Sequence, residues 1–362
     1  MFQTERAAGT RRSGVNTRMP LRGIAALIVV VLVALLASAC GNNNSNSNAG
    51  GANAGESTPA PANAGSSGPP PAEEAATKTV KHYYGETEVP AHPQRVAVIG
   101  LEDIALSLGV PLVYAYGFEG YYLYDRLKAT NVTLSDSPDT KPNLEKILAA
   151  HPDLIILQGY FTDEAGYKEL SKIAPTIAYT PADWKANIVA IGDVLGLADK
   201  AQETIAAYDD KLKQAKDAIA AAAGDRNSVV FLRPSDKDLQ VFFPSFEPLL
   251  YNDLGLKPDA SIDEFQKESE DDWGINTSLE KLPSITADYV FAIYGGSISS
   301  EDEFQKEMAA STEVEKLSVW KALPAVKNNH VFKVSARTWM SSGPIANGYV
   351  IDDVKAAVTG AK

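Results

Sequence analysis

The feature that most constrains this chain is a pattern that occurs twice, 135 residues apart. The first copy has LEKI at 144–147, five further residues and DLII at 153–156, and the second has LEKL at 279–282, five residues and DYVF at 288–291. Each copy predicts a short helix that presents a glutamate, a connection containing proline, and a buried strand that opens with aspartate. Such units build α/β sheets, and one long-period repeat predicts two similar lobes, the alternative being a coincidence of common patterns.

Apolar runs at 95–100, 112–115, 153–156 and 177–179 alternate with helical segments, which predicts a mainly parallel sheet. A second series of strands, expected to follow the same order, begins at 228–232 and ends at 331–334. The fold class is therefore α/β, with two Rossmann-like lobes at 79–196 and 225–362.

The segment 197–223 is rich in alanine, aspartate, lysine and glutamine, and contains no glycine or proline. It predicts one long helix, 197–224, of about 40 Å at 1.5 Å per residue, which joins the lobes. The alternative is a surface helix that belongs to one lobe. A helical connection allows only a small closure.

Arg11, Arg12, Arg18 and Arg22 precede the uncharged run 23–39, which is followed by Cys40, the only cysteine in the chain. A basic start, an apolar stretch and small residues before a cleavage point indicate export. We expect residues 1–39 to be a lipoprotein signal peptide and Cys40 to carry the lipid, although Ala37 stands where a lipobox usually has leucine. A membrane-spanning helix is the alternative, and both Met1 and Met19 could be the start.

We assign residues 40–78 to the lipidated cysteine and a linker. The linker is predicted to be disordered, because large apolar residues are scarce there. The chain has a net charge of −13, and loss of five arginines and one glutamate with residues 1–39 makes it −17. Such acidity argues against nucleic acid and anionic lipid surfaces as partners. We expect a monomeric, extracytoplasmic body that is anchored to the cell membrane through Cys40.

Several further phrases match one family. They are HPQRVAV at 92–98, PNLEKI at 142–147 continuing to HPDLII at 151–156, LSKIAPT at 170–176, WKALPAV at 320–326, and GPIA at 343–346 followed by IDD at 351–353. Through them, residues 81–354 resemble the helical-backbone, class III periplasmic binding proteins that supply ABC importers with iron–siderophore complexes. Lys141 departs from the glutamate that the family often has there.

The resemblance implies that Glu145 and Glu280 dock into arginine pockets of an ABC transporter permease; two ordinary solvated glutamates are the alternative. It implies a ferric siderophore of hydroxamate or citrate type as ligand, with the iron carried inside the ligand and no cofactor. No catalytic residues and no resident metal site are expected, so the chain is not predicted to be an enzyme. A haem or corrinoid binder and, from another class, a cell-surface enzyme or adhesion module are the alternatives.

Ligands of parallel sheets bind beyond the carboxyl ends of the strands. Aromatic residues there would suit a broad, partly apolar chelate, and arginines could pair with its oxygens. The alternatives are aromatic residues that cap the lobe cores and arginines in ordinary surface pairs; whether a tyrosine touches iron stays open. The predicted ligand-binding residues are Arg233, Trp339, Tyr294, Tyr160, Tyr116, Arg337 and Trp184.

Overall fold

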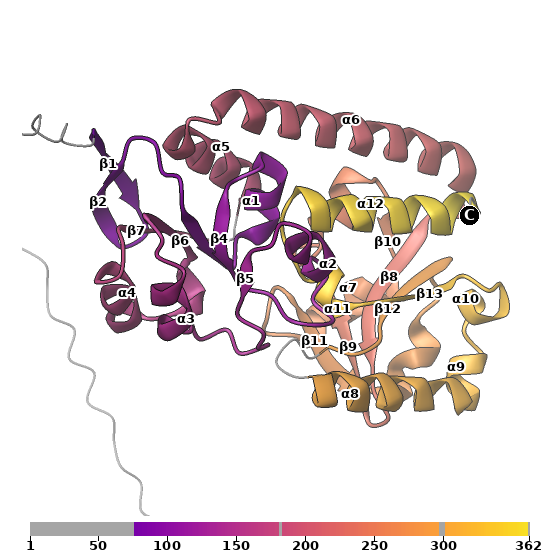
Figure 1. Ribbon diagram of the computed structural model, residues 1–362. Coiled ribbons are helices and arrows are strands. Elements are labelled where there is room, and N and C mark those ends of the chain that lie inside the picture. Colours follow the sequence, from indigo (N-terminus) through magenta and orange to yellow (C-terminus); the bar gives the residue numbers. More distant parts are fainter. Residues whose placement is uncertain (1–75, 181–182, 297–300, 361–362) are drawn as a thin grey trace, which may run out of the picture. The chain divides into compact units, whose positions relative to one another are not determined.

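The computed structural model describes residues 76–180, 183–296 and 301–360 (Figure 1). The predicted signal peptide, Cys40 and nearly all of the predicted linker lie outside the described residues. The described chain opens with an antiparallel hairpin, β1 (Thr77–His82) and β2 (Gly85–Pro90). Within these ranges, no helix is both long and apolar enough to cross a membrane.

The first lobe contains a five-stranded parallel sheet in the order β5-β4-β3-β6-β7. Its central strands are buried on both faces, which explains their continuous apolar sequences. The four predicted strands of this lobe are confirmed as β3 (Val96–Ile99), β4 (Leu112–Ala115), β6 (Leu154–Gln158) and β7 (Thr176–Tyr179). The short edge strand β5 (Thr133–Leu134) was not predicted.

The second lobe contains a mixed six-stranded sheet, β11-β9-β8-β12-β13, with β10 also paired to β8. The expectation that it repeats the order of the first lobe is wrong, because β9 runs antiparallel to both of its neighbours, β8 and β11. The Ser235 amide donates to the Asp238 carbonyl (2.9 Å), which closes a tight turn that only an antiparallel neighbour can follow. The strands are β8 (Ser228–Pro234), β9 (Asp238–Phe242), β10 (Lys257–Pro258), β11 (Gly274–Ser278), β12 (Tyr289–Ile293) and β13 (Val331–Val334).

The repeated aspartate has the same task in both lobes. The Asp153 carboxylate accepts hydrogen bonds from the backbone N–H groups of Gln94 (2.7 Å) and Arg95 (2.9 Å), directly before β3. The Asp288 carboxylate accepts from the backbone N–H of Ser228 (3.0 Å), the first residue of β8. The repeat therefore marks the place where the central strand of each sheet is fixed to its neighbour.

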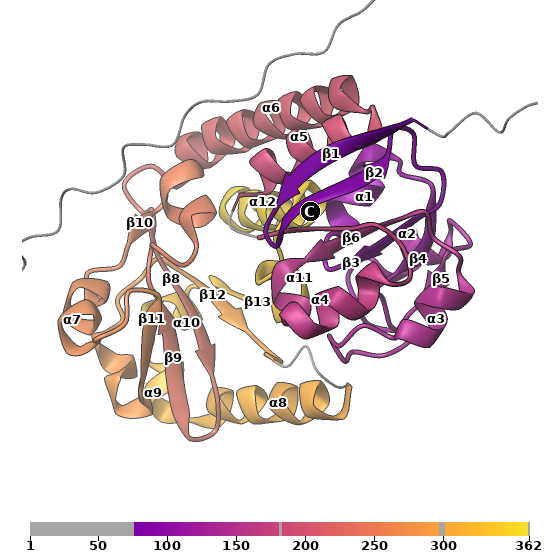
Figure 2. The same cartoon turned by 90° about the vertical axis from the view of Figure 1, so that its left-hand side faces the viewer.

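The predicted connecting helix is confirmed as α6 (Ala198–Ala223), whose 26 residues span about 39 Å. It runs beside the C-terminal helix α12 (Pro344–Thr359) along the same side of both sheets (Figures 1 and 2). The other helices are α1 (Glu102–Leu108), α2 (Tyr124–Lys128), α3 (Leu144–Ala149), α4 (Glu164–Ser171), α5 (Trp184–Leu195), α7 (Ser261–Glu268), α8 (Glu301–Glu313), α9 (Ser318–Lys321), α10 (Pro324–Lys327) and α11 (Ala336–Trp339). Short 3-10 segments are η1 (Gly159–Phe161), η3 (Leu279–Ser284) and η4 (Val314–Lys316), and η2 (Leu249–Asp253) is π-helical.

One apolar core continues from the first lobe into the second. It contains Ile156 of β6 and Phe231 of β8, together with Ile219 of α6 and Ile351 of α12, each at most 2% exposed. Separating the lobes would expose this shared surface to water, at a cost of about 25 cal/mol for each Å² of apolar area. The two helices therefore hold the sheets as one packed unit.

We expect ligand binding to change the dimensions of the protein very little, because wide closure would have to break this shared core. Small-angle scattering of the chain from Cys40 onward, with and without a bound ferric chelate, would measure the change in radius of gyration. A decrease of the size that hinged binding proteins show would contradict the expectation.

Candidate functional site

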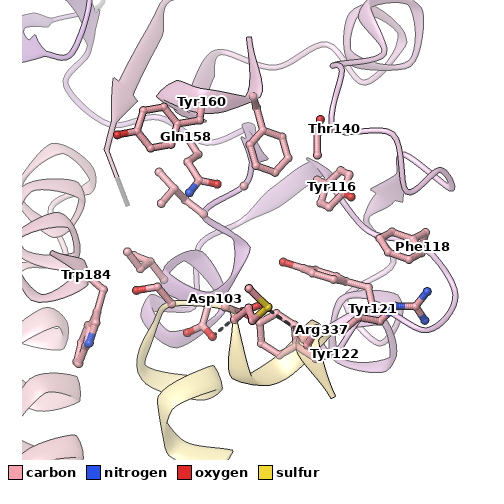
Figure 3. A pocket seen from close by; sticks show the side chains of 18 of the residues that line it. Asp103, Tyr116, Phe118, Tyr121, Tyr122, Thr140, Gln158, Tyr160, Trp184 and Arg337 are labelled. Atoms are coloured by element: carbon pink, nitrogen blue, oxygen red, sulfur yellow. Dashed lines mark hydrogen bonds between the residues drawn. The ribbon is translucent and has the colours of Figure 1, made fainter. Parts of the chain in front are cut away.

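A cavity of about 480 Å³ lies where segments of the two lobes meet (Figure 3). Several of its lining residues stand at or shortly after the carboxyl ends of β3, β4, β6, β12 and β13, as expected for a parallel sheet. These residues are Gly100, Tyr116, Gln158, Gly296 and Ala336. Chain segments far apart in the sequence therefore build one pocket.

One side of the cavity is an aromatic cluster. The ring of Tyr116 makes edge contacts with Phe118, Tyr121 and Phe161 at centroid distances of 5.8, 5.6 and 5.2 Å. The Tyr116 hydroxyl donates to the Pro138 carbonyl (2.9 Å), which fixes the ring. Tyr116 is thus a predicted residue that lines the cavity in a rigid, apolar wall.

Two other predicted aromatic residues line the cavity at different places. Trp184, the first residue of α5, lies across the pocket from the tyrosine cluster (Figure 3) and contacts Tyr208 of α6 edge-on at 4.9 Å. Tyr160 of η1 is 68% exposed. The hydroxyl of Tyr84 holds this segment by donating to the carbonyls of Gly159 (3.1 Å) and Thr162 (2.9 Å). Tyr160 therefore presents a large free ring on a fixed backbone.

Arg337 of α11 lines the cavity although its side chain is only 6% exposed. Its Nη1 donates to the Glu301 carboxylate (2.8 Å) and to the Gly120 carbonyl (3.3 Å). The rings of Phe118 and Phe304 lie 5.4 and 4.0 Å from the guanidinium carbon. The structure thus places a buried positive charge in the wall of the pocket of an acidic protein.

The other three predicted binding residues are not among those that line this cavity. Trp339 is 2% exposed, stacks on Phe291 at 4.9 Å, and donates its indole N–H to Asp353 (2.9 Å). Tyr294 is also 2% exposed and donates its hydroxyl to Glu315 (2.6 Å). Both side chains pack inside the second lobe, because the apolar face there supplies their contacts.

Arg233 is the last of these three. Its half-buried guanidinium lies against Gly296, which itself lines the cavity. A side chain at position 296 would collide with it, so the glycine allows this close approach. The contribution of Arg233, Trp339 and Tyr294 to ligand binding stays a prediction.

Two buried acids at the base of the cavity were not predicted. The Asp103 carboxylate accepts hydrogen bonds from the backbone N–H groups of Ile345 (2.9 Å) and Ala346 (2.8 Å) in the first turn of α12. It also accepts from the Tyr122 hydroxyl (2.9 Å; Figure 3). Asp103 therefore caps a helix whose bonded N–H groups are 242 and 243 residues away in the sequence, and Gly343 before that helix leaves room for the carboxylate.

Glu102 is fully buried, and its Oε1 accepts from the backbone N–H groups of Gly100 and Tyr116, both at 2.9 Å. It thereby joins the ends of β3 and β4 under the pocket floor. Its Oε2 has no hydrogen-bond partner among the described residues. The strand-end rule could have found both acids, because they directly follow β3, but their burial could not be read from the sequence.

Burial raises the pKa of Glu102 from its ordinary value of 4.5 to about 8. Between these values the folded state holds a proton that the unfolded chain has released, so the free energy of unfolding should fall as the pH rises. The slope for one proton is about 1.4 kcal/mol per pH unit. Glu102→Gln cannot release this proton and should lack its contribution to that fall, as measured by denaturant unfolding from about pH 5 to about pH 9.

Glu264→Gln is the matched control, because Glu264 lies on the exposed side of α7. It should keep the pH dependence of the wild-type protein. An unchanged pH dependence in Glu102→Gln would show that the buried carboxyl titrates as it does in the unfolded chain.

The two glutamates predicted to dock lie on the surface, one in each lobe. Glu145 is in the first turn of α3, and Glu280 is in the first turn of η3. Neither lines the cavity. Leu148, which follows Glu145 on the same helix, is 57% exposed. Among the described residues, no group of three or more histidines, cysteines or carboxylates is placed to hold a metal ion.

Comparison with known proteins gives one consistent result. Residues 122–338 match the family model described as periplasmic binding protein. The chain is 31% identical over 332 residues to the iron(3+)-hydroxamate-binding protein FhuD of Bacillus subtilis, covering 89% of this chain and 93% of that protein. It is 28% identical to the probable siderophore-binding lipoprotein YfiY of the same organism, covering 92% and 97%.

Solved structures agree with these matches. Staphylococcus aureus SirA, complexed with staphyloferrin B, is similar with a TM-score of 0.62 and 28% identity, over 78% of this chain and 98% of that chain. A FhuD fold-family binding protein of a Fep/Fec-like ferrichrome ABC transporter from Bacillus subtilis has a TM-score of 0.64 and 29% identity, over 77% and 99%.

Proposed function

Because the chain belongs to the periplasmic binding protein family, we propose that it is an extracytoplasmic receptor that binds a ferric siderophore and delivers it to an ABC importer. The ligand is of hydroxamate or citrate type, and the protein acts by binding rather than as an enzyme. The observation that carries this proposal is the cavity between the lobes, which joins an aromatic wall to a buried arginine. The names of the relatives support the same class of ligand.

The chemistry of the cavity suits a metal that arrives already wrapped in its chelator. Aromatic rings pack against the apolar parts of such a ligand, and arginine donates hydrogen bonds to its oxygens. The iron then needs no ligand from the protein and no cofactor. Tyr160, Tyr116, Trp184 and Arg337 supply these contacts from the cavity wall.

The remaining parts of the chain serve delivery. We propose that residues 1–39 direct export, that Cys40 carries the lipid, and that 40–78 tether the folded part to the membrane. The lobes 79–196 and 225–362, joined by 197–224, then reach the permease as a monomer. The name of one relative, a probable siderophore-binding lipoprotein, supports the anchor.

The proposed ligand class is tested by titrating the protein, from Cys40 onward, with ferric hydroxamate and ferric citrate-type chelates. We expect quenching of tryptophan fluorescence, because Trp184 lines the cavity. Trp184→Phe keeps an aromatic ring in the cavity wall, so it should reduce affinity in equilibrium dialysis only modestly while it removes much of the quenching. A dissociation constant of about 1 μM corresponds to a binding free energy of about −8 kcal/mol. If no ferric chelate binds at least this tightly, the proposed function is wrong.

Delivery of the ligand to the permease is tested with the two surface glutamates. Glu145→Ala combined with Glu280→Ala should leave ligand affinity nearly unchanged and abolish uptake, because paired carboxylates can engage permease arginines while lying outside the cavity. Iron uptake by cells that depend on this protein, with dialysis of the purified variant, gives both readouts. A large loss of ligand affinity in the double variant would show that these residues act in ligand binding rather than in docking.

A further inference from the structure

The hydrogen bonds of the Arg337 guanidinium are incomplete, and this bears on how the pocket binds anionic ligands. Two of the three guanidinium nitrogens, Nε and Nη2, are buried and have no hydrogen-bond partner among the residues that the structure describes. Nη1 is bound to Glu301 and to Gly120. A buried guanidinium with unused donors is costly, so this site favours an additional anionic acceptor.

The partner of Arg337 is much less firmly held than Arg337 itself. The Glu301 side chain is 53% exposed and stands at the first residue of α8. Hydrogen bonds from Gln305 and Arg337 lower its pKa, so it carries a negative charge at neutral pH. An exposed carboxylate can return to water at little cost, whereas the arginine is enclosed by Phe118 and Phe304.

The other charged groups near the pocket do not relieve this pairing. The Asp103 carboxylate lines the cavity and already accepts hydrogen bonds from the N–H groups of α12 and from Tyr122, and the Arg233 guanidinium lies at a different place in the wall, against Gly296. With Glu301 in place, its carboxylate neutralises the positive charge of Arg337 at this contact. An anionic chelate pairs fully with Arg337 when the Glu301 carboxylate moves away.

We propose that Glu301 competes with the anionic oxygens of the ligand for Arg337, and that the pocket selects ferric chelates carrying free carboxylates. The inference rests on the proposed function and narrows its ligand class. The ligand carboxylate takes the place of Glu301 at the guanidinium, and Glu301 turns into solvent. A chelate without such a group leaves the Arg337–Glu301 pair in place and gains nothing from Arg337.

The test compares Glu301→Gln with Asp302→Asn, which makes the same change in net charge at the next, exposed residue of α8. Each variant of the chain from Cys40 onward is titrated with ferric citrate, which is anionic, and with ferrioxamine B, a cationic trihydroxamate. Glu301→Gln should bind ferric citrate about tenfold more tightly than wild type, the size expected for one charge-assisted contact. Its affinity for ferrioxamine B should stay the same or fall, because the wall becomes more positive.

Asp302→Asn should change neither affinity by more than about twofold, since an exposed charge away from the contact is screened. The gain in Glu301→Gln should shrink at high salt for the same reason. Arg337→Lys keeps the charge but loses the planar donor edge, so it should weaken ferric citrate binding. Matching circular dichroism and unfolding midpoints confirm that each variant is folded.

Wild-type affinity, or weaker affinity, of Glu301→Gln for ferric citrate would overturn the inference, and so would an equal gain for both chelates. These results would leave the proposed function intact, because the wild-type protein still binds a ferric chelate. Failure of the folded wild-type protein to bind either chelate, or any other of the panel, would instead overturn the proposed function and this inference with it.

Discussion

The shared apolar core under α6 and α12 is the constraint on which the rest of the structure depends. Two sheets from different parts of the chain pack against the same pair of helices. The apolar surface that one lobe buries is therefore continuous with the surface that the other buries. The hydrophobic effect has no direction, and it alone would not fix the angle between the lobes. The continuous helix α6 supplies the fixed spacing, and the cavity forms where the strand ends face each other.

A polar contact completes this arrangement at the pocket. The first turn of α12 has N–H groups with no partner in its own helix, and the carboxylate of Asp103 from the first lobe accepts two of them. Burial raises the pKa of Asp103 to about 6, while the same N–H groups oppose that rise. The contact sets the position of α12, and with it the preceding segment that carries Arg337 and Ser342 along the cavity.

Under the proposed function, an acidic protein must bind an anionic ligand. A net charge of −13 repels anionic ligands at long range, but salt screens that field beyond about 8 Å. Inside the cavity the local charges decide, and Arg337 is enclosed by aromatic rings where its charge is screened little. In the competition proposed above, selectivity depends on which carboxylate, that of Glu301 or that of the ligand, pairs with the guanidinium.

The sequence by itself determined the two-lobed α/β fold, the strands around β3, β6, β8 and β12, and the long helix α6. These follow from local rules: apolar runs form buried strands, and an alanine-rich stretch without glycine or proline forms a helix. It also placed Tyr116, Tyr160, Trp184 and Arg337 near strand ends, where the cavity is.

Only the tertiary structure decided which of the candidate residues face the cavity. Trp339 and Trp184 have equivalent places after their strands, yet one packs on Phe291 in the core and the other lines the pocket. A side chain after a strand can turn to either side, and the packing of distant segments determines which. The tertiary structure likewise decided the antiparallel direction of β9. It also brought together the residues of the Asp103 cap and of the Arg337–Glu301 pair, which are far apart in the sequence.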